Sequence, residues 1–317
     1  MSRLFRDIDG DVLFPQGSVV CIGAFDGLHL GHVALVRRTV ERATALGVPA
    51  VALTFEPLPR EFFARDNKQP RLMMSSNRVE LLWTLGIDSV GLLRFNHAMT
   101  QMTPQEFSQR ILHDRLCARE VWVGPGFAYG NRRAGNMDTL RAEGAALGFS
   151  AHEIETQTMD RERVSSSRVR SLLAAGEFAA AETLLGRPYR IVGKVVHGAK
   201  LGRTLGFPTA NIRYSTYQPV LHGIYACWVD LPNGQRYAAV ASFGTRPVVN
   251  GTVPLLEVHL FDFEGDLYGQ RIQVEFVAKL RDEVHFASLE SLTEQMHADA
   301  ATARDVLFNQ QPQRATA

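Results

Sequence analysis

The sequence predicts two domains: a doubly wound α/β domain, followed by a small antiparallel β-barrel with a C-terminal helix. Three observations support this. A chain of 317 residues is long for one domain and suits two. The first half alternates between strand-like apolar runs and segments of helical spacing, whereas the second half holds short runs divided by turns. The change falls at residues 186–188 (GRP), so we expect domains at 1–186 and 187–317.

The first domain is expected to hold a parallel sheet with helices on both faces, because its strands alternate with helices of about 10 to 15 residues. Its strands are predicted at residues 18–24, 48–55, 89–95, 120–123 and 152–158. Its helices are predicted at 32–46, 77–85, 103–116 and 137–147, with a last helix at 166–185 that is broken near Gly176.

The second domain shows the pattern of a small barrel, since several short strands follow one another with turns between them. The turns include residues 232–234 (PNG) and 264–266 (EGD). Strands are predicted at 189–196, 223–230, 236–242, 255–261 and 271–280, and one helix at 289–308.

Composition narrows the function classes. The net charge is +1 and is spread evenly, so we expect neither a nucleic-acid partner nor a membrane partner. Cys21, Cys117 and Cys227 form no CxxC pair and are expected to be buried thiols in a reducing compartment. The N-terminus lacks the apolar run of a signal peptide, which favours a cytoplasmic protein that acts on small molecules. The oligomeric state stays open.

The stretch 23–32 (GAFDGLHLGH) places two histidines three residues apart, directly after a predicted strand. Ligands of open α/β sheets bind beyond the carboxyl ends of the strands, where the next helix offers unpaired N–H groups. His29 and His32 could donate hydrogen bonds to a phosphoryl group in transfer. An attack by a substrate phosphate on the α-phosphate of ATP needs no protein nucleophile. An isolated HxxH pair is more often a surface or capping pair.

The pattern GxFDGxHxGH resembles the HxGH nucleotidylyltransferases, and within them the prokaryotic bifunctional riboflavin kinase/FMN adenylyltransferase (FAD synthetase) family. The resemblance covers almost the whole chain. It implies that His29 and His32 bind the phosphates of ATP during AMP transfer to FMN. It also implies that the ATP site includes Gly23, Phe25, Asp26 and Gly31.

Two later segments add to the resemblance. Residues 54–59 (TFEPLP) are similar to a strand-end motif that often ends Pro-His-Pro, with Leu58 where that histidine often stands. Residues 163–170 (RVSSSRVR) resemble the family segment Ile-Ser-Ser-Thr-x-Ile-Arg at the start of a helix. Taken alone, a serine run before a helix is usually a cap. The resemblance implies that ATP phosphates are bound by Arg163, Ser166, Ser167 and Arg170.

The segment 123–130 (VGPGFAYG) departs from the family loop, which usually has Asp or Asn before its first Phe and Phe before its last Gly. Gly126 has no side chain to bind a ligand, and Tyr129 replaces the second Phe. Gly126 and Leu58 therefore favour an alternative, in which the first domain only binds a nucleotide or flavin, while the intact histidines oppose it. A third hypothesis, nucleotidyl transfer to a non-flavin phosphate, depends on HxGH alone.

In the second half, residues 193–203 (GKVVHGAKLGR) could form a glycine-rich flap over polyphosphate, although such a stretch alone is more often a β-turn. Thr209 and Asn211 offer two oxygen ligands of the kind that Mg²⁺ prefers, unless they only form a turn after Pro208. Alternation places Glu257 and His259 on one strand face, where a carboxylate could accept the proton of an alcohol that attacks ATP.

These segments occur with GTRP, LEVHLFDF and DLYG in the order of the family's riboflavin kinase module. The resemblance implies that Thr209 and Asn211 bind Mg²⁺ with ATP, and that Glu257 is the base for the riboflavin 5′-hydroxyl. It implies that further ATP contacts come from Gly198, Lys200, Gly202 and Arg203. Arg281, Phe286 and the helix through Asp299 are expected to pack around the flavin. The expected reactions are riboflavin to FMN and FMN to FAD, both with ATP and Mg²⁺.

Overall fold

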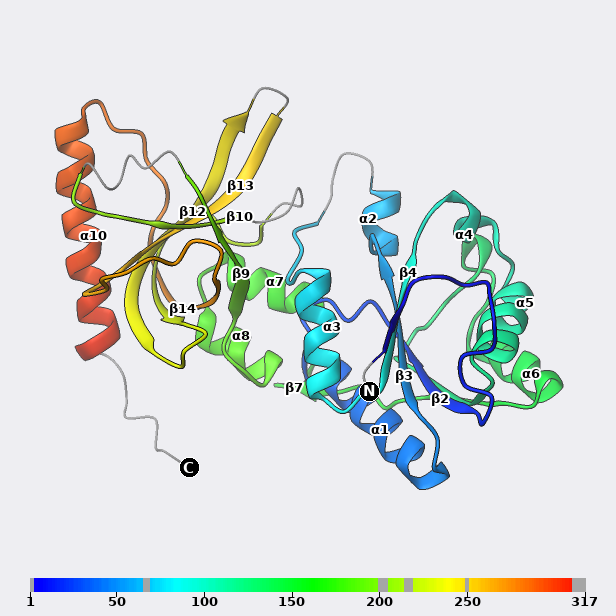
Figure 1. Cartoon of the computed structure of the whole chain (residues 1–317). Coiled ribbons are helices and arrows are strands. Elements are labelled where there is room, and N and C mark those ends of the chain that lie inside the picture. The colour runs from blue at the N-terminus through cyan, green and yellow to red at the C-terminus, as the bar shows by residue number, and fades with distance from the viewer. Residues whose placement is uncertain (1–2, 65–68, 199–204, 214–218, 249–250, 310–317) are drawn as a thin grey trace. The chain divides into compact units, whose positions relative to one another are not determined.

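A computed structural model of the chain (Figure 1) describes residues 3–64, 69–198, 205–213, 219–248 and 251–309. They form two compact units. The first holds residues 73–166 and the chain before Pro70, and the second holds Pro70–Leu72 and the chain from Ser167 onward. Lys200, Gly202 and Arg203 lie outside the described residues. The predicted domain boundary after Gly186 stays a prediction.

The first unit is built on a six-stranded sheet in the order β1-β4-β3-β2-β5-β6, and every neighbouring pair is parallel. The strands are β1 (Arg3–Phe5), β2 (Ser18–Ile22), β3 (Ala50–Glu56), β4 (Ser89–Arg94), β5 (Ala118–Val123) and β6 (Ser150–Glu153). The connecting helices are α1 (Leu30–Leu46), α2 (Pro59–Phe63), α3 (Ser75–Thr84), α4 (His97–Gln101), α5 (Pro104–Glu106), the π-helix η1 (Phe107–Arg115), the 3₁₀ turn η2 (Asn131–Arg133) and α6 (Met137–Leu147).

Each face of this sheet has its own apolar core, because successive side chains of a strand point to opposite faces. Val20 and Ile22 of β2 belong to one core, together with Ile111 of η1 and Leu140 of α6. Val19 and Cys21 belong to the other core, which includes residues of α1 and α3. Figure 1 shows helices on both sides of the sheet. The predicted doubly wound fold is confirmed.

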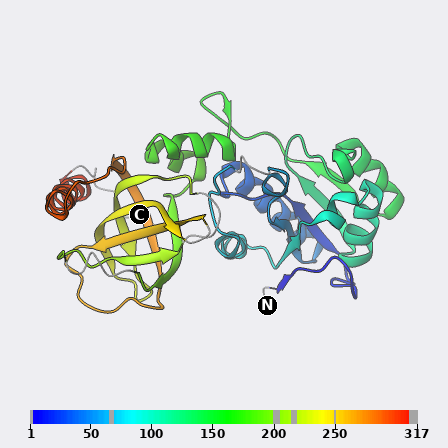
Figure 2. The same cartoon turned by 90° about the horizontal axis from the view of Figure 1, so that it is seen from above.

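The second unit contains α7 (Ser166–Ala174) from Ser167 onward, α8 (Phe178–Leu185) and a closed barrel. The strand order of the barrel is β10-β13-β12-β11-β14-β9, with antiparallel neighbours (Figure 2). Gly176, at φ 81°, separates the two helices as predicted. Helix α10 (Leu289–Asn309) packs its Ala303 and Leu307 against Ala226 and Ala238 of the barrel wall. The strands are β9 (Arg190–Val196), β10 (Ala210–Arg213), β11 (Gly223–Asp230), β12 (Arg236–Val248), β13 (Gly251–Leu260) and β14 (Arg271–Arg281). The predicted barrel with its final helix is confirmed.

Several predicted elements differ in extent. The strand predicted at 152–158 is wrong beyond Glu153, because the chain leaves the sheet there and forms a hairpin of β7 (Thr158–Met159) and β8 (Glu162–Arg163). The helix predicted at 103–116 is mostly the π-helix η1. Cys21 and Cys227 are buried as expected, whereas Cys117 is half-buried in the turn between η1 and β5. Among the described helices, none is both long and apolar enough to cross a bilayer.

Candidate active sites

The two histidines of the first unit lie side by side at the start of α1, just beyond the carboxyl end of β2. His29 is the N-cap of α1, and its Nδ1 accepts a long hydrogen bond of 3.4 Å from the backbone N–H of His32. The imidazole rings stack with centroids 3.8 Å apart. His29 is therefore a capping residue, but that role leaves the ring hydrogen on Nε2, the atom that can donate to a phosphate oxygen.

Two glycines of this stretch make room for the rings. A Cβ atom at Gly31 would lie 3.2 Å from the imidazole of His29, and one at Gly23 would lie 3.0 Å from the ring of Phe25. Phe25 is fully buried and meets His32 edge-on at 5.4 Å. Phe25 and Leu28 have positive φ angles of 49° and 42°, a conformation that costs energy for residues with side chains. Packing thus holds the histidines in one arrangement.

Buried polar side chains attach this stretch to its neighbours. Asp26 is fully buried, forms an ion pair with Arg60 and accepts the backbone N–H of Met73 at 3.3 Å. Ser166 donates to the carbonyl of Asp26 at 2.8 Å. The structure therefore brings Asp26 and Ser166 together beside the histidines, with the Asp26 carboxylate engaged in holding the loop.

Sequence reasoning missed Arg78, the residue that fixes the start of the histidine loop. Its guanidinium is fully buried and donates to the carbonyls of Ala24 at 3.0 Å and Phe55 at 2.9 Å. It also forms an ion pair of 3.2 Å with Glu56. A charged residue inside a predicted helix normally faces water, so no sequence signal marked it as buried.

The other predicted ATP contacts are divided between the units. Arg163 donates to the carbonyl of Pro125 at 3.1 Å and so contacts the loop that departs from the family pattern. Ser167 and Arg170 belong to the second unit. Arg170 is buried and donates to the carbonyl of Pro70 at 2.6 Å.

Two of the three residues that depart from the family pattern, Leu58 and Tyr129, have physical explanations. Leu58 is fully buried, a position that suits an apolar side chain. The hydroxyl of Tyr129 donates to Glu143 at 2.6 Å, and Ser108 donates to the same carboxylate at 2.5 Å. Burial and the bond to Glu143 raise the pKa of Tyr129 above its ordinary value. Gly126 has φ 75° and open space around an added Cβ.

A large cavity of about 1020 Å³ opens in the first unit at the ends of β3 and β4. Of its lining residues, only Glu56 belongs to a motif that the sequence analysis singled out, the segment 54–59. Charged side chains come from the loop after β1 and from both strand ends, and two methionines come from α4 and the turn after it. They include Asp9, Glu56, Arg94, Met99 and Met102.

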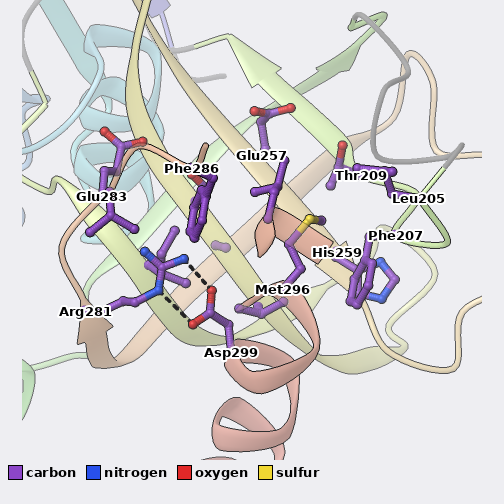
Figure 3. Close-up of a pocket in the computed structure, with 16 residues that line it drawn as sticks. Leu205, Phe207, Thr209, Glu257, His259, Arg281, Glu283, Phe286, Met296 and Asp299 are labelled. Carbon is purple, nitrogen blue, oxygen red and sulfur yellow. Dashed lines mark hydrogen bonds and ion pairs between the residues drawn. The ribbon is translucent and has the colours of Figure 1, made fainter. Parts of the chain in front are cut away.

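In the second unit, a cavity of about 290 Å³ gathers residues from the barrel and α10 (Figure 3). Glu257 and His259 both line it, while their neighbours Leu256 and Val258 are fully buried in the barrel. The predicted alternation along β13 is confirmed. Thr209 lines the same cavity as Phe207 and His259.

Asn211 lies beside Glu257, since these two residues are register partners of β10 and β13. Its side-chain nitrogen donates to the carbonyl of Thr209 at 3.2 Å. Its buried Oδ1 has no hydrogen-bond partner within the described part of the chain. A Cβ atom at Gly198 would lie 2.5 Å from that oxygen, so only glycine lets the flap segment approach it. A buried oxygen without a donor suits a hard cation such as Mg²⁺.

The far side of the cavity is closed by an ion pair between β14 and α10. Arg281 donates two hydrogen bonds to Asp299, at 2.8 and 2.6 Å, and its guanidinium lies 5.7 Å from the ring centroid of Phe286 (Figure 3). Gln295 donates to the same carboxylate at 3.0 Å. Arg281, Phe286 and Asp299, which the sequence analysis expected around the flavin, therefore line one wall of the cavity.

Comparisons with known proteins agree with both halves. The model of the FAD synthetase family matches residues 12–168, and that of the riboflavin kinase family matches residues 185–307. The solved structure titled "Crystal Structure of Macrolide-efflux Protein from Streptococcus pneumoniae" is similar with a TM-score of 0.78 at 28% identity, covering 96% of this chain and 99% of that one.

Several curated relatives carry the name bifunctional riboflavin kinase/FMN adenylyltransferase, and three of them illustrate the similarity. The protein from Haemophilus influenzae is 39% identical over 97% of this chain and 99% of its own length. The one from Pseudomonas fluorescens is 45% identical over 91% and 93%, and the one from Escherichia coli K12 is 39% identical over 96% and 97%. This chain belongs to the bifunctional riboflavin kinase/FMN adenylyltransferase family.

Proposed function

We propose that the stacked histidines of the first unit and Glu257 of the second unit carry the two reactions of this family in this chain. The chain phosphorylates riboflavin to FMN with ATP, and transfers AMP from ATP to FMN to give FAD and pyrophosphate. One observation carries the assignment. In the first unit, His29 and His32 lie where a strand ends and a helix begins, and in the second unit the carboxylate of Glu257 lines a cavity.

In FMN adenylylation, a phosphate oxygen of FMN attacks the α-phosphorus of ATP, and the bond to pyrophosphate breaks. His29 and His32 donate hydrogen bonds to the phosphate oxygens on which charge builds up. Arg163 and Ser166 of the first unit are proposed to hold the remaining phosphates, together with the backbone from Gly23 to Gly31. The cavity at the ends of β3 and β4 is the proposed place of FMN, because β3 is the sheet neighbour of β2, the strand that leads into the histidine loop.

In riboflavin phosphorylation, Glu257 accepts the proton of the 5′-hydroxyl while that oxygen attacks the γ-phosphorus of ATP, and ADP leaves. Thr209 and Asn211 are the proposed holders of Mg²⁺, which neutralises phosphate charge when bound. The flap residues Gly198, Lys200, Gly202 and Arg203 are proposed to cover the ATP phosphates. The Arg281–Asp299 pair fixes the wall against which the flavin ring packs.

The test supplies the purified chain with FMN, ATP and Mg²⁺ but no riboflavin, and follows FAD and pyrophosphate by chromatography. We expect both products in equal amounts. A parallel reaction with riboflavin in place of FMN is the control, because FMN formation there shows that the barrel is folded and active. FMN formation in that control without any FAD in either reaction would show that the first unit only binds its ligands, which is the alternative that Gly126 suggested.

A further inference from the structure

His259 occupies a defined place in the kinase cavity. It lies two residues after Glu257 on β13 and lines the cavity together with Thr209 and Phe207 (Figure 3). Its Nδ1 lies 2.9 Å from the carbonyl oxygen of Pro208. A carbonyl oxygen only accepts hydrogen bonds, so Nδ1 carries the hydrogen and donates it.

This bond lies where the backbone ladder ends. The pairing of β10 with β13 begins at Ala210 opposite Val258, so Pro208 and Thr209 precede the first paired residue. The imidazole of His259 supplies a donor to the Pro208 carbonyl at this point. This side-chain hydrogen bond extends the link between the two strands beyond the last backbone pair, to Pro208, the residue before Thr209.

The ring of Phe207 fixes the same segment from a second direction. Phe207 is 5% exposed, with its ring centroid 5.0 Å from that of His259 and 4.8 Å from that of His297 on α10. Phe207 and Pro208 are thus both held by His259, one through ring packing and the other through a hydrogen bond. Thr209 follows directly and turns its side chain to the cavity.

We propose that His259 is a positioning residue for nucleotide binding in the kinase site, because its bond to Pro208 fixes the place of the Thr209 hydroxyl. The inference depends on the proposed role of Thr209 and Asn211 in holding Mg·ATP. His259 lies on the same strand as Glu257 and binds the residue before Thr209. It therefore keeps the distance between Glu257 and Thr209 constant.

The test compares three substitutions at one position. His259→Asn places an amide N–H close to the location of Nδ1, whereas the longer His259→Gln places it near Nε2, and His259→Ala removes the donor. We expect His259→Ala and His259→Gln to raise the KM for Mg·ATP in riboflavin phosphorylation about tenfold, the effect of losing one hydrogen bond. We expect His259→Asn to stay within about threefold of the original chain. The maximal rate should change far less than KM.

Two controls separate positioning from damage to the fold. His297→Ala removes the other ring that packs on Phe207 but keeps the hydrogen bond to Pro208, and we expect a smaller rise in KM than for His259→Ala. FAD formation from supplied FMN should be unchanged in the His259 and His297 variants that keep His29 and His32. Mg·ADP binding is measured by isothermal titration in chains that also carry His29→Ala and His32→Ala, which weaken the nucleotide site of the first unit. The affinity for Mg·ADP should fall by the same factor by which KM rises.

The outcomes distinguish the inference from its basis. If Thr209→Ala weakens Mg·ADP binding but the Ala and Gln variants of His259 do not, the inference is wrong and the proposed kinase site stands. If Thr209→Ala also leaves binding unchanged, the assignment of the metal–nucleotide segment itself is wrong. A fall in maximal rate at constant KM, equal for Asn, Gln and Ala, would also overturn the positioning role.

Discussion

The two proposed active sites are encoded in different ways. The histidine site of the first unit comes from one stretch of ten residues, between the end of β2 and the start of α1. The kinase cavity is assembled from the segment before β10, from β11, β12, β13 and β14, and from α10, so its residues are up to about a hundred positions apart in sequence. A local site is kept as long as one loop keeps its shape, whereas a dispersed site depends on closure of the whole barrel. The comparison predicts that the two activities can be lost separately.

The largest effect is expected at the local site. Replacing His29 and His32 together by Ala should lower FAD formation from FMN by at least about a hundredfold, because both donors to the phosphate oxygens are lost. FMN formation from riboflavin should be unchanged. Both rates are measured by chromatography on the same preparation. A parallel loss of FMN formation would contradict the separation of the two sites.

The matching change in the dispersed site is Glu257→Gln, which keeps the shape of the side chain but removes the base. Riboflavin phosphorylation should fall by about 10² to 10⁴. FAD formation from supplied FMN should stay at its original rate, and so serves as the internal control. If phosphorylation continues at a similar rate, another group accepts the proton of the 5′-hydroxyl.

A smaller effect tests whether the dispersed site depends on packing. Asp299→Ala leaves Arg281 without its partner on α10 and should destabilise the barrel by about 1 to 3 kcal/mol. It should also raise the KM for riboflavin severalfold, since the wall of the cavity loosens. Urea unfolding and kinase kinetics check the two effects. Asp262→Asn is the matched control, because it breaks an exposed pair with Arg304 on the same helix, which should contribute less than about 1 kcal/mol. Asn also tolerates the φ angle of 56° at this position.

The smallest effect concerns Gly126 in the first unit. Gly126→Asn adds a polar side chain into open space, and Asn accepts a φ angle of 75° better than most residues. We expect a modest gain in FMN adenylylation, a KM for one substrate lowered about two- to threefold. Gly126→Ala controls for backbone strain alone and should lower stability without any gain. Equal behaviour of the two variants would show that no side chain is needed there.

Sequence reasoning worked best where a function is encoded locally. The histidine stretch and the alternation of Glu257 and His259 followed from spacing alone, and the structure places both as expected. Strands β1 and β10 were missed because three and four residues are too few to show a period of two. Arg78 was missed because the partners that stabilise a buried guanidinium are backbone carbonyls from elsewhere in the chain, which no local pattern reveals.

The carbonyl of Ala24 accepts hydrogen bonds from both Arg78 and Thr54, the latter at 3.2 Å. The entropy of ordering the histidine loop is therefore lost during folding, before any nucleotide arrives, and the loop is preorganised. Stability and catalysis then share one residue. A substitution at Arg78 should appear first as heat sensitivity of FAD formation, at temperatures where FMN formation still proceeds.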